Sequence, residues 1–348
     1  MKIAIINDTH FGARNDSPLF LEYFMSFFEK QFFPYCKQNN ITKVLHLGDL
    51  MDRRKFVNFQ TLAEVRKRFI EWFENNNVEL HCILGNHDTF YKNTNHVNSI
   101  RELFHNKYKY LHLYEEPTIM EFGGLKIALV PWINKENEQI FHKFIKSCPA
   151  SIICGHFELN GYEVIQGINF EGGMDDSILS CYDMVLSGHF HGKNSKKNVH
   201  YLGTQYQITF SDARLTKGFH VFDTDTRELE FIENPERMYH IIVYDDSNLS
   251  NDPLGDDFSY YKNSYVKVLV SKKTNAVKFD QWVDRMVHGG VINLNIVEEA
   301  IETSSDTVDV AQDTMSIINE EIDKLEITED KGKIKSLIHE LYIESLSV

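Results

Sequence analysis

Short apolar runs alternate with longer amphipathic stretches over the first two hundred residues. The runs predict buried strands at 2–6, 44–47, 78–84, 125–130, 151–154 and 184–186. Between them, residues 19–35 and 59–73 carry apolar side chains at helical spacing. Strands that alternate with helices predict a layered α/β domain.

The pattern changes after residue 204. Residues 219–223 and 228–232 are joined by a turn sequence and predict a hairpin. Strands are expected at 241–244, 265–270 and 291–297, with a helix at 277–287. We therefore predict a first domain at 1–215, a smaller α+β capping domain at 216–298, and an acidic linker with C-terminal helices at 299–348.

The last fifty residues are acidic and amphipathic. Between Glu298 and Asp330, twelve acidic residues accompany the single Lys324. An apolar stripe at helical spacing runs through Val308, Ala311, Met315, Ile318, Ile322 and Leu325, and a second comprises Ile334, Leu337, Ile338 and Leu341. Such stripes pack against their own domain or dock another protein, and the pattern leaves both open.

Composition indicates a globular protein, because 42% of the 348 residues are hydrophobic. The amino terminus has too short an apolar run for a signal peptide, and no stretch approaches a membrane span. The five cysteines form no Cys-x-x-Cys pair, so neither a zinc knuckle nor a disulfide framework is predicted. We expect a reduced, cytoplasmic protein.

The net charge of −15 is distributed unevenly. Residues 1–220 carry 24 Lys and Arg against 24 Asp and Glu, and residues 221–348 carry 12 against 27. The neutral part has short basic clusters at 53–55, 66–68 and 193–197. Each cluster is either a solvated face or a contact for nucleic-acid phosphates. Arg53, Arg54 and Lys193 are the candidate DNA-binding residues.

Five predicted strands end in residues that bind metal ions. The ends read Asn7-Asp8-Thr9-His10, Gly48-Asp49, Gly85-Asn86-His87-Asp88, Gly155-His156 and Gly188-His189-Phe190-His191. The third is also a good turn sequence by itself. Together, however, carboxylates and imidazoles favour manganese, iron or zinc. Two such cations about 3.5–4 Å apart, bridged by a carboxylate, are suited to phosphodiester hydrolysis.

These motifs, in this order, resemble those of the calcineurin-like metallophosphoesterases. The resemblance implies an αββα sandwich, in which two β-sheets lie between layers of helices. Within them the chain is most similar to SbcD-type nuclease subunits of double-strand-break repair complexes, and especially to recombination nuclease subunits of large phages. Residues 130–132, 155–161, 188–191 and 201–204 carry that closer likeness, which covers residues 1 to about 215 well and the smaller domain only loosely. The resemblance implies that one metal is held by Asp8, His10, Asp49 and His191, and the other by Asp49, Asn86, His156 and His189.

The resemblance also implies roles beside the metals. His87 would be unligated and would act as the catalytic acid. Asp88 is expected to shape its loop. Such nucleases often have a histidine at position 52, whereas the pair Asp52-Arg53 matches the phosphatase branch of the family. In that branch the aspartate orients the catalytic histidine, so we expect Asp52 to fix the tautomer of His87. This departure puts the balance of endonuclease and exonuclease activity in doubt.

The resulting hypothesis is a manganese-dependent DNA phosphodiesterase, with magnesium as the other candidate metal, that cuts duplex ends as an exonuclease and single strands as an endonuclease. By resemblance it would be a homodimer and would bind an SbcC-like coiled-coil ATPase through its C-terminal helices. It would work in the host cytoplasm if it is phage-encoded. The alternatives are a phosphoprotein phosphatase or small-molecule phosphodiesterase of the same fold, and a catalytically dead DNA-binding subunit.

Overall fold

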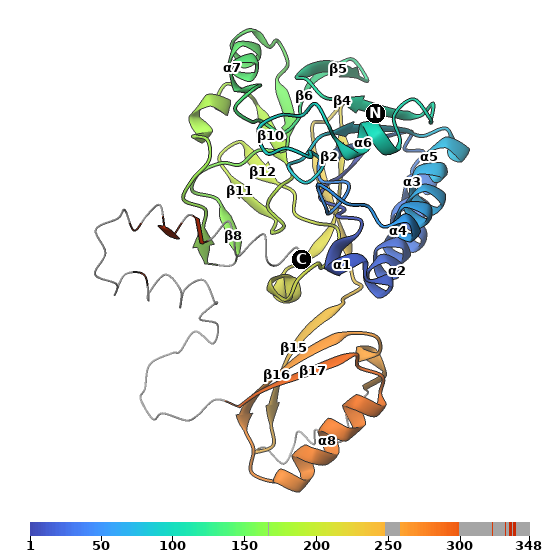
Figure 1. The fold of residues 1–348 in the computed structure, drawn as a ribbon, viewed down its shortest axis with the longest axis vertical. Coiled ribbons are helices and arrows are strands. Elements are labelled where there is room, and N and C mark those ends of the chain that lie inside the picture. The colour runs from blue at the N-terminus through green and yellow to red at the C-terminus, as the bar shows by residue number, and fades with distance from the viewer. Residues whose placement is uncertain are drawn as a thin grey trace. The chain divides into compact units, whose positions relative to one another are not determined.

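The computed structural model describes residues 1–165, 167–247 and 258–298, together with Ile322, Lys331, Ile334, Lys335, Leu337 and Ile338. The described chain forms two compact units (Figure 1). The first contains residues 1–208 and 215–236, and the second contains residues 209–214 and 237–298. Most of the acidic segment predicted from residue 299 onward, including five of the six residues of its first stripe, lies outside the described residues.

The first unit is built on two six-stranded sheets. One sheet has the order β14-β13-β1-β2-β3-β4, and the other has the order β11-β12-β10-β7-β6-β5. The first sheet consists of β1 (Lys2–Ile6), β2 (Lys43–Leu47), β3 (Glu79–Ile83), β4 (Leu111–Tyr114), β13 (Lys217–Asp223) and β14 (Leu229–Asn234). The second consists of β5 (Thr118–Phe122), β6 (Leu125–Val130), β7 (Ile152–Gly155), β10 (Met184–Ser187), β11 (Asn194–Lys196) and β12 (Val199–Tyr201). A short hairpin adds β8 (Glu163–Ile165) and β9 (Ile168–Asn169).

Helices cover the outer faces of both sheets (Figure 1). Two long helical stretches lie on the first sheet, and each has a π-helical middle. They comprise α2 (Pro18–Phe27), η1 (Phe28–Phe32) and α3 (Phe33–Gln38), then α4 (Phe59–Glu64), η2 (Val65–Ile70) and α5 (Glu71–Asn76). The shorter helices are α1 (Ala13–Asp16), α6 (Ser99–Leu103), α7 (Glu138–Ser147) and η3 (Asp176–Leu179).

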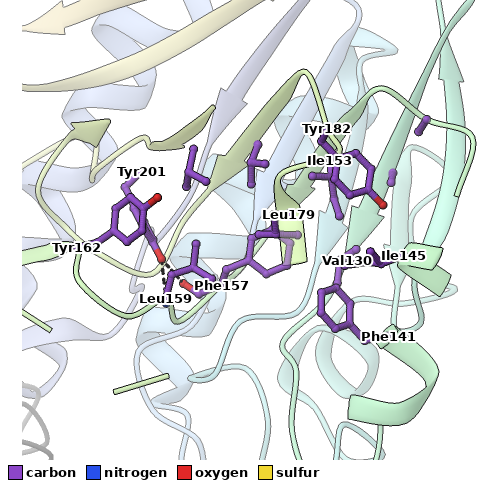
Figure 2. Packing of buried hydrophobic residues seen from close by; sticks show 14 of the residues in the cluster. Val130, Phe141, Ile145, Ile153, Phe157, Leu159, Tyr162, Leu179, Tyr182 and Tyr201 are labelled. Carbon is purple, nitrogen blue, oxygen red and sulfur yellow. Dashed lines mark hydrogen bonds between the residues drawn. The ribbon is translucent and has the colours of Figure 1, made fainter. Parts of the chain in front are cut away.

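Two apolar layers hold this sandwich together. Between the sheets, Ile5 and Leu45 of the first sheet pack in one cluster with Leu129 and Ile152 of the second. On the outside of the second sheet, residues of α7 pack on β6, β7 and β10 in another cluster, part of which is shown in Figure 2. The layer order is therefore helix, sheet, sheet, helix, which confirms the predicted fold class.

The predicted hairpin exists as β13 and β14, but its assignment to the smaller domain was wrong. β13 pairs antiparallel with β1, from Lys2 opposite Asp223 to Ile5 opposite His220. The strand is buried along almost its whole length. It therefore completes the first sheet, and the first unit extends to residue 236 instead of ending at 215.

The second unit contains a three-stranded parallel sheet of β15 (Tyr239–Asp245), β16 (Tyr265–Lys272) and β17 (Asn293–Glu298). Its helices are η4 (Phe210–Arg214), η6 (Phe258–Tyr261) and α8 (Ala276–His288). Phe279, Trp282 and Met286 of α8 pack on Val266 and Val268 of β16. The strands and the helix expected in this region are thus confirmed.

Candidate metal centre

The predicted ligands converge because parallel strands end at the same edge of a sheet. β1, β2 and β3 are parallel neighbours, and so are β7 and β10 in the facing sheet. Each of these strands is followed directly by one of the five motifs. The structure accordingly brings together all seven predicted ligands: Asp8, His10, Asp49, Asn86, His156, His189 and His191.

The first group surrounds His10. The ligand atoms of Asp8, His10 and His191 all lie within 4.8 Å of one another. Nε2 of His10 is 3.2 Å from Nε2 of His191 and 3.7 Å from Oδ2 of Asp49. All four residues predicted for one metal therefore turn ligand atoms towards the same space.

The second group surrounds Asn86. Its Oδ1 lies 2.9 Å from Nε2 of His156 and 3.0 Å from Nδ1 of His189. Nε2 of His156 is in turn 3.3 Å from Oδ2 of Asp49. Asp49 thus faces both groups, as a bridging ligand must.

The atoms of this centre require a positive charge between them. The Nδ1–H group of His156 donates a hydrogen bond to the main-chain carbonyl oxygen of Leu47, at 2.8 Å. In the neutral ring, Nε2 then presents a lone pair to the oxygens of Asp49 and Asn86. Acceptors facing one another in a buried site need a proton or a cation between them. The donor set of carboxylate, amide and imidazole groups fits divalent cations.

Two further carboxylates lie beside predicted ligand histidines. An oxygen of Asp52 lies 3.1 Å from Nδ1 of His10, and an oxygen of Glu158 lies 3.6 Å from Nε2 of His189, which is the distance of an ion pair and too long for a hydrogen bond. In both cases the opposite ring nitrogen faces the centre. A carboxylate as close to a metal-binding histidine as Asp52 is to His10 fixes the tautomer and increases basicity. Glu158 follows His156 by two residues in the same motif, but no role was predicted for it from the sequence.

Asp52 does not act on His87 as predicted. Its carboxylate points to His10, and its main-chain carbonyl oxygen lies 2.5 Å from Nδ1 of His87. The main chain therefore fixes the tautomer of His87, and the side chain does not. His87 stands with its ring edge to His10, at 4.8 Å between centroids, and its ring nitrogen lies within 4.8 Å of ligand atoms of His10 and Asp49.

Asp88 shapes the loop, as expected. Its buried carboxylate accepts hydrogen bonds from the main-chain N–H groups of Asp49, Leu50, Met51 and Gly85, at 2.8–3.2 Å. These bonds fasten the Gly48-Asp49 turn to the Gly85-Asn86-His87 turn. Burial and the Asp49 carboxylate raise the pKa of Asp88 to about 6, although the N–H donors oppose this.

Four of the predicted ligands lie on strained backbone. Asp8, His10, Asp49 and His189 all have positive φ, between 42° and 89°. This conformation is uncommon for residues other than glycine, and such strain persists where the surroundings fix it. The motif glycines allow close approach between turns: a Cβ on Gly48 would lie 2.6 Å from Nδ1 of His156, and a Cβ on Gly85 would clash with Asp49.

Burial and charge shift the pKa values in the centre. Burial lowers the pKa of His10 and His156, but the neighbouring carboxylates outweigh it and raise both to about 9. For the Asp49 carboxylate burial acts in the other direction and raises the pKa, but the imidazoles of His156 and His87 outweigh burial and hold this pKa well below its usual range. For His87 burial prevails and lowers the pKa. The centre thus attracts positive charge.

The three candidate DNA-binding residues lie in different settings. Arg53 pairs with Asp16 at 3.2 Å and donates to Oδ1 of Asn15 at 2.5 Å, and Arg54 is half-buried. Nζ of Lys193 lies 3.7 Å from the ring centroid of Phe231, beside a cavity of about 390 Å³. A DNA contact by these residues stays a prediction.

The described part of the chain contains no helix that is long and apolar enough to cross a membrane.

Residues 1–193 match the family model of the calcineurin-like phosphoesterases. The chain is also 32% identical, over 99% of its own length and 99% of the relative's, to exonuclease subunit 1 of Enterobacteria phage T4.

Among solved structures, an archaeal phosphodiesterase is 15% identical with a TM-score of 0.32, covering 67% of this chain and all of the other. GAP50, the anchor in the inner membrane complex of Plasmodium, is 13% identical with a TM-score of 0.38, covering 68% of this chain and 90% of the other. At these TM-scores neither likeness adds to the assignment.

Proposed function

Because the chain belongs to the calcineurin-like phosphoesterase family, we propose that it is a two-metal DNA phosphodiesterase, the nuclease subunit of a repair or recombination complex. The observation that carries the proposal is the convergence of seven potential ligand side chains, of which Asp49 faces both groups, with the imidazole of His87 beside them. The end-to-end similarity to a phage exonuclease subunit supports DNA as the substrate. We propose exonuclease activity on duplex ends and endonuclease activity on single strands.

Asp8, His10, Asp49 and His191 would hold one divalent cation, and Asp49, Asn86, His156 and His189 the other, with manganese favoured over magnesium because imidazoles supply many of the ligands. When bound, the cations would neutralise the phosphate and lower the pKa of an attacking water. The protein contributes the positions of these ligands through the turns that Asp88 joins.

His87 would supply the proton for the departing oxygen. Its Nδ1 proton is committed to the Asp52 carbonyl oxygen, so the transferred proton must leave from Nε2 of the doubly protonated ring. Burial lowers the pKa of the free ring. An anionic phosphate that enters the site raises the pKa of this ring again and favours its protonated form. Protonation of the acid is therefore coupled to substrate binding.

Digestion of labelled DNA in manganese tests this assignment. Duplex and single-stranded substrates should be degraded, and His87→Ala should remove most of the activity while the protein stays folded. A phosphopeptide and an aryl phosphodiester are the comparison substrates. Phosphopeptide turnover without DNA degradation would overturn the nuclease assignment.

A phosphatase or small-molecule phosphodiesterase is the second candidate, because Asp52-Arg53 matches the phosphatase branch. In that function Arg53 would have to reach the substrate phosphate. Here its guanidinium is engaged by Asp16 and Asn15, and this engagement bears equally on a DNA contact by Arg53, so it does not separate the two functions. The comparison substrates above decide between the two activities. A DNA-binding subunit without activity is disfavoured because all seven ligand residues are present.

We also propose that an SbcC-like coiled-coil ATPase binds the C-terminal helical segments, including the second stripe, of which Ile334, Leu337 and Ile338 are described as helical. The support is the resemblance to SbcD-type subunits and the word subunit in the relative's name. Deleting residues 300–348 should abolish ATPase binding and spare metal-dependent cleavage of a small diester. Loss of both activities would count against this division.

A homodimer is proposed through the catalytic unit. Phe56 and Phe59, before and at the start of α4, are 73% and 84% exposed. A contact between two copies of this unit would remove these apolar side chains from water. Light scattering on Phe59→Ser should show a smaller particle than the unaltered protein. We place this complex in the host cytoplasm if the chain is phage-encoded, as its T4 relative is.

A further inference from the structure

A second group of metal-binding side chains lies on the first sheet, away from the motifs. His81 of β3 stands directly opposite His112 of β4 in the parallel register. Glu79 precedes His81 by two residues, so its side chain projects from the same face of the sheet. The three residues come from the first half of β3 and from β4, whereas Gly85 and Asn86 of the motif follow the far end of β3.

The three side chains are close enough to share one ion. One ligand atom from each of Glu79, His81 and His112 lies within 4.8 Å of the other two. Nε2 of His81 is 3.0 Å from Oε2 of Glu79, and the two imidazole rings stack with centroids 4.9 Å apart. This arrangement was not predicted from the sequence, because the three residues form no compact motif.

His81 is held as a ligand would be. Its Nδ1 lies 2.8 Å from Oη of Tyr114, which fixes the ring and leaves Nε2 facing Glu79. The ring is 3% exposed and lies edge-on against Phe122 of β5. Burial and the neighbouring His112 lower its pKa to about 4, so the ring is neutral at physiological pH.

Glu79 already has a cationic partner, whereas His112 has no hydrogen-bond partner within the described ranges. The ammonium of Lys43 on β2 pairs with Oε2 of Glu79. The ring of His112 makes no hydrogen bond to any residue within the described ranges, although it stacks on His81. The group thus holds a carboxylate that attracts cations and an imidazole whose nitrogens are available.

We propose that Glu79, His81 and His112 form a zinc site that is separate from the catalytic centre. Two imidazoles and one carboxylate are a frequent zinc donor set, and they leave a fourth position for water. Zinc would take the place of the Lys43 ammonium at Glu79. The bound ion would fasten the edge strand β4 to β3, the strand that leads into Asn86 and His87.

Zinc binding measured by equilibrium dialysis on the full chain tests this site. The unaltered protein should hold one more zinc ion per chain than His112→Gln and than Glu79→Gln. His142→Gln, at a partly exposed histidine on α7, is the matched control and should bind as much zinc as the unaltered protein. Manganese-dependent cleavage by the His112→Gln protein should be unchanged, which shows that the catalytic centre is intact.

Removal of the Lys43 ammonium should increase zinc affinity, in contrast to the ligand substitutions, which should decrease it. Lys43→Met should bind zinc at this site more tightly by about tenfold, because it removes a positive charge a few ångströms from the ion. A hydrogen-bonded network without a metal predicts no such gain. Equal zinc content in His112→Gln and the unaltered protein, or unchanged affinity in Lys43→Met, would overturn the zinc site whether or not the protein degrades DNA.

Discussion

The main-chain carbonyl oxygen of Asp52 lies 2.5 Å from Nδ1 of His87, while the carboxylate of the same residue lies 3.1 Å from Nδ1 of His10. One residue therefore orients two imidazoles with two different groups. A side-chain substitution at position 52 alters only one of these contacts. This separates the part that Asp52 plays in metal binding from the part that it plays in proton transfer.

Asp52→Asn should weaken metal binding about 10–100-fold, because the residue supports a ligand histidine. His87→Ala should leave metal affinity unchanged and lower the cleavage rate about 10²–10⁴-fold at saturating metal. Manganese titrations monitored by calorimetry, with cleavage rates at each metal concentration, distinguish the two effects. Full metal affinity in Asp52→Asn, together with a rate loss like that of His87→Ala, would place the carboxylate on His87 after all.

Gly48→Ala should disrupt the metal centre by crowding. Gly48 has φ +91°, and a Cβ there would lie 2.6 Å from Nδ1 of His156 and 2.7 Å from the Cα of Gly85. Gly124 has nearly the same φ, +82°, with nothing within 4 Å of its Cβ position. Gly124→Ala should therefore introduce only backbone strain and lower the free energy of unfolding by about 1 kcal/mol. The measurements are manganese affinity and urea unfolding, and equal effects of the two substitutions would exclude crowding as the cause.

Asp88→Ala should lower the free energy of unfolding of the first unit by at least about 3 kcal/mol. The substitution leaves the N–H groups of Asp49, Leu50, Met51 and Gly85 without their buried acceptor. Asp88→Asn keeps one acceptor oxygen and should give a smaller loss. Urea unfolding followed by circular dichroism measures both. An Asp88→Ala protein within about 1 kcal/mol of the unaltered one would show that water replaces the carboxylate.

Much of the centre was predictable because its information is local. Each ligand follows an apolar run, and parallel strands bring their ends together, so Asp8, Asp49 and Asn86 could be placed in one site from the sequence. The role of Asp52 could not be placed correctly. Its contact with His87 uses a carbonyl group that every residue possesses, so no residue type indicates it.

The hairpin of β13 and β14 was assigned to the wrong unit for a different reason. Its own turn and alternation are visible in the sequence, but the strand that receives it is β1, at the other end of the first unit. Long-range pairing of this kind carries no local signal. Similarly, positive φ at Asp8, His10 and His189 is fixed by the surroundings, because even Asp and His, which adopt it more often than most residues other than glycine, have negative φ at most positions.

The last prediction concerns acid stability of the second unit. Asp246 accepts hydrogen bonds from the main-chain N–H groups of Thr274 and Asn275, at 2.6 and 3.0 Å, just before α8 begins. Burial raises the pKa of its carboxyl, but these donors and the Tyr244 hydroxyl outweigh burial and lower the pKa from 3.8 to about 2.

A carboxyl whose folded pKa is depressed stabilises the fold above its unfolded pKa, and that contribution is lost as the pH falls through the folded value. The second unit should therefore lose stability between pH 4 and about pH 2. Asp246→Asn should be less stable at pH 7 and show a flatter dependence over this window, whereas Asp280→Asn, on the exposed face of α8, should follow the unaltered protein. Unfolding monitored through the buried Trp282, with Trp72 and Trp132 replaced by phenylalanine, reports on this unit. Equal slopes for Asp246→Asn and the unaltered protein would show that the anchor of α8 does not depend on this charge.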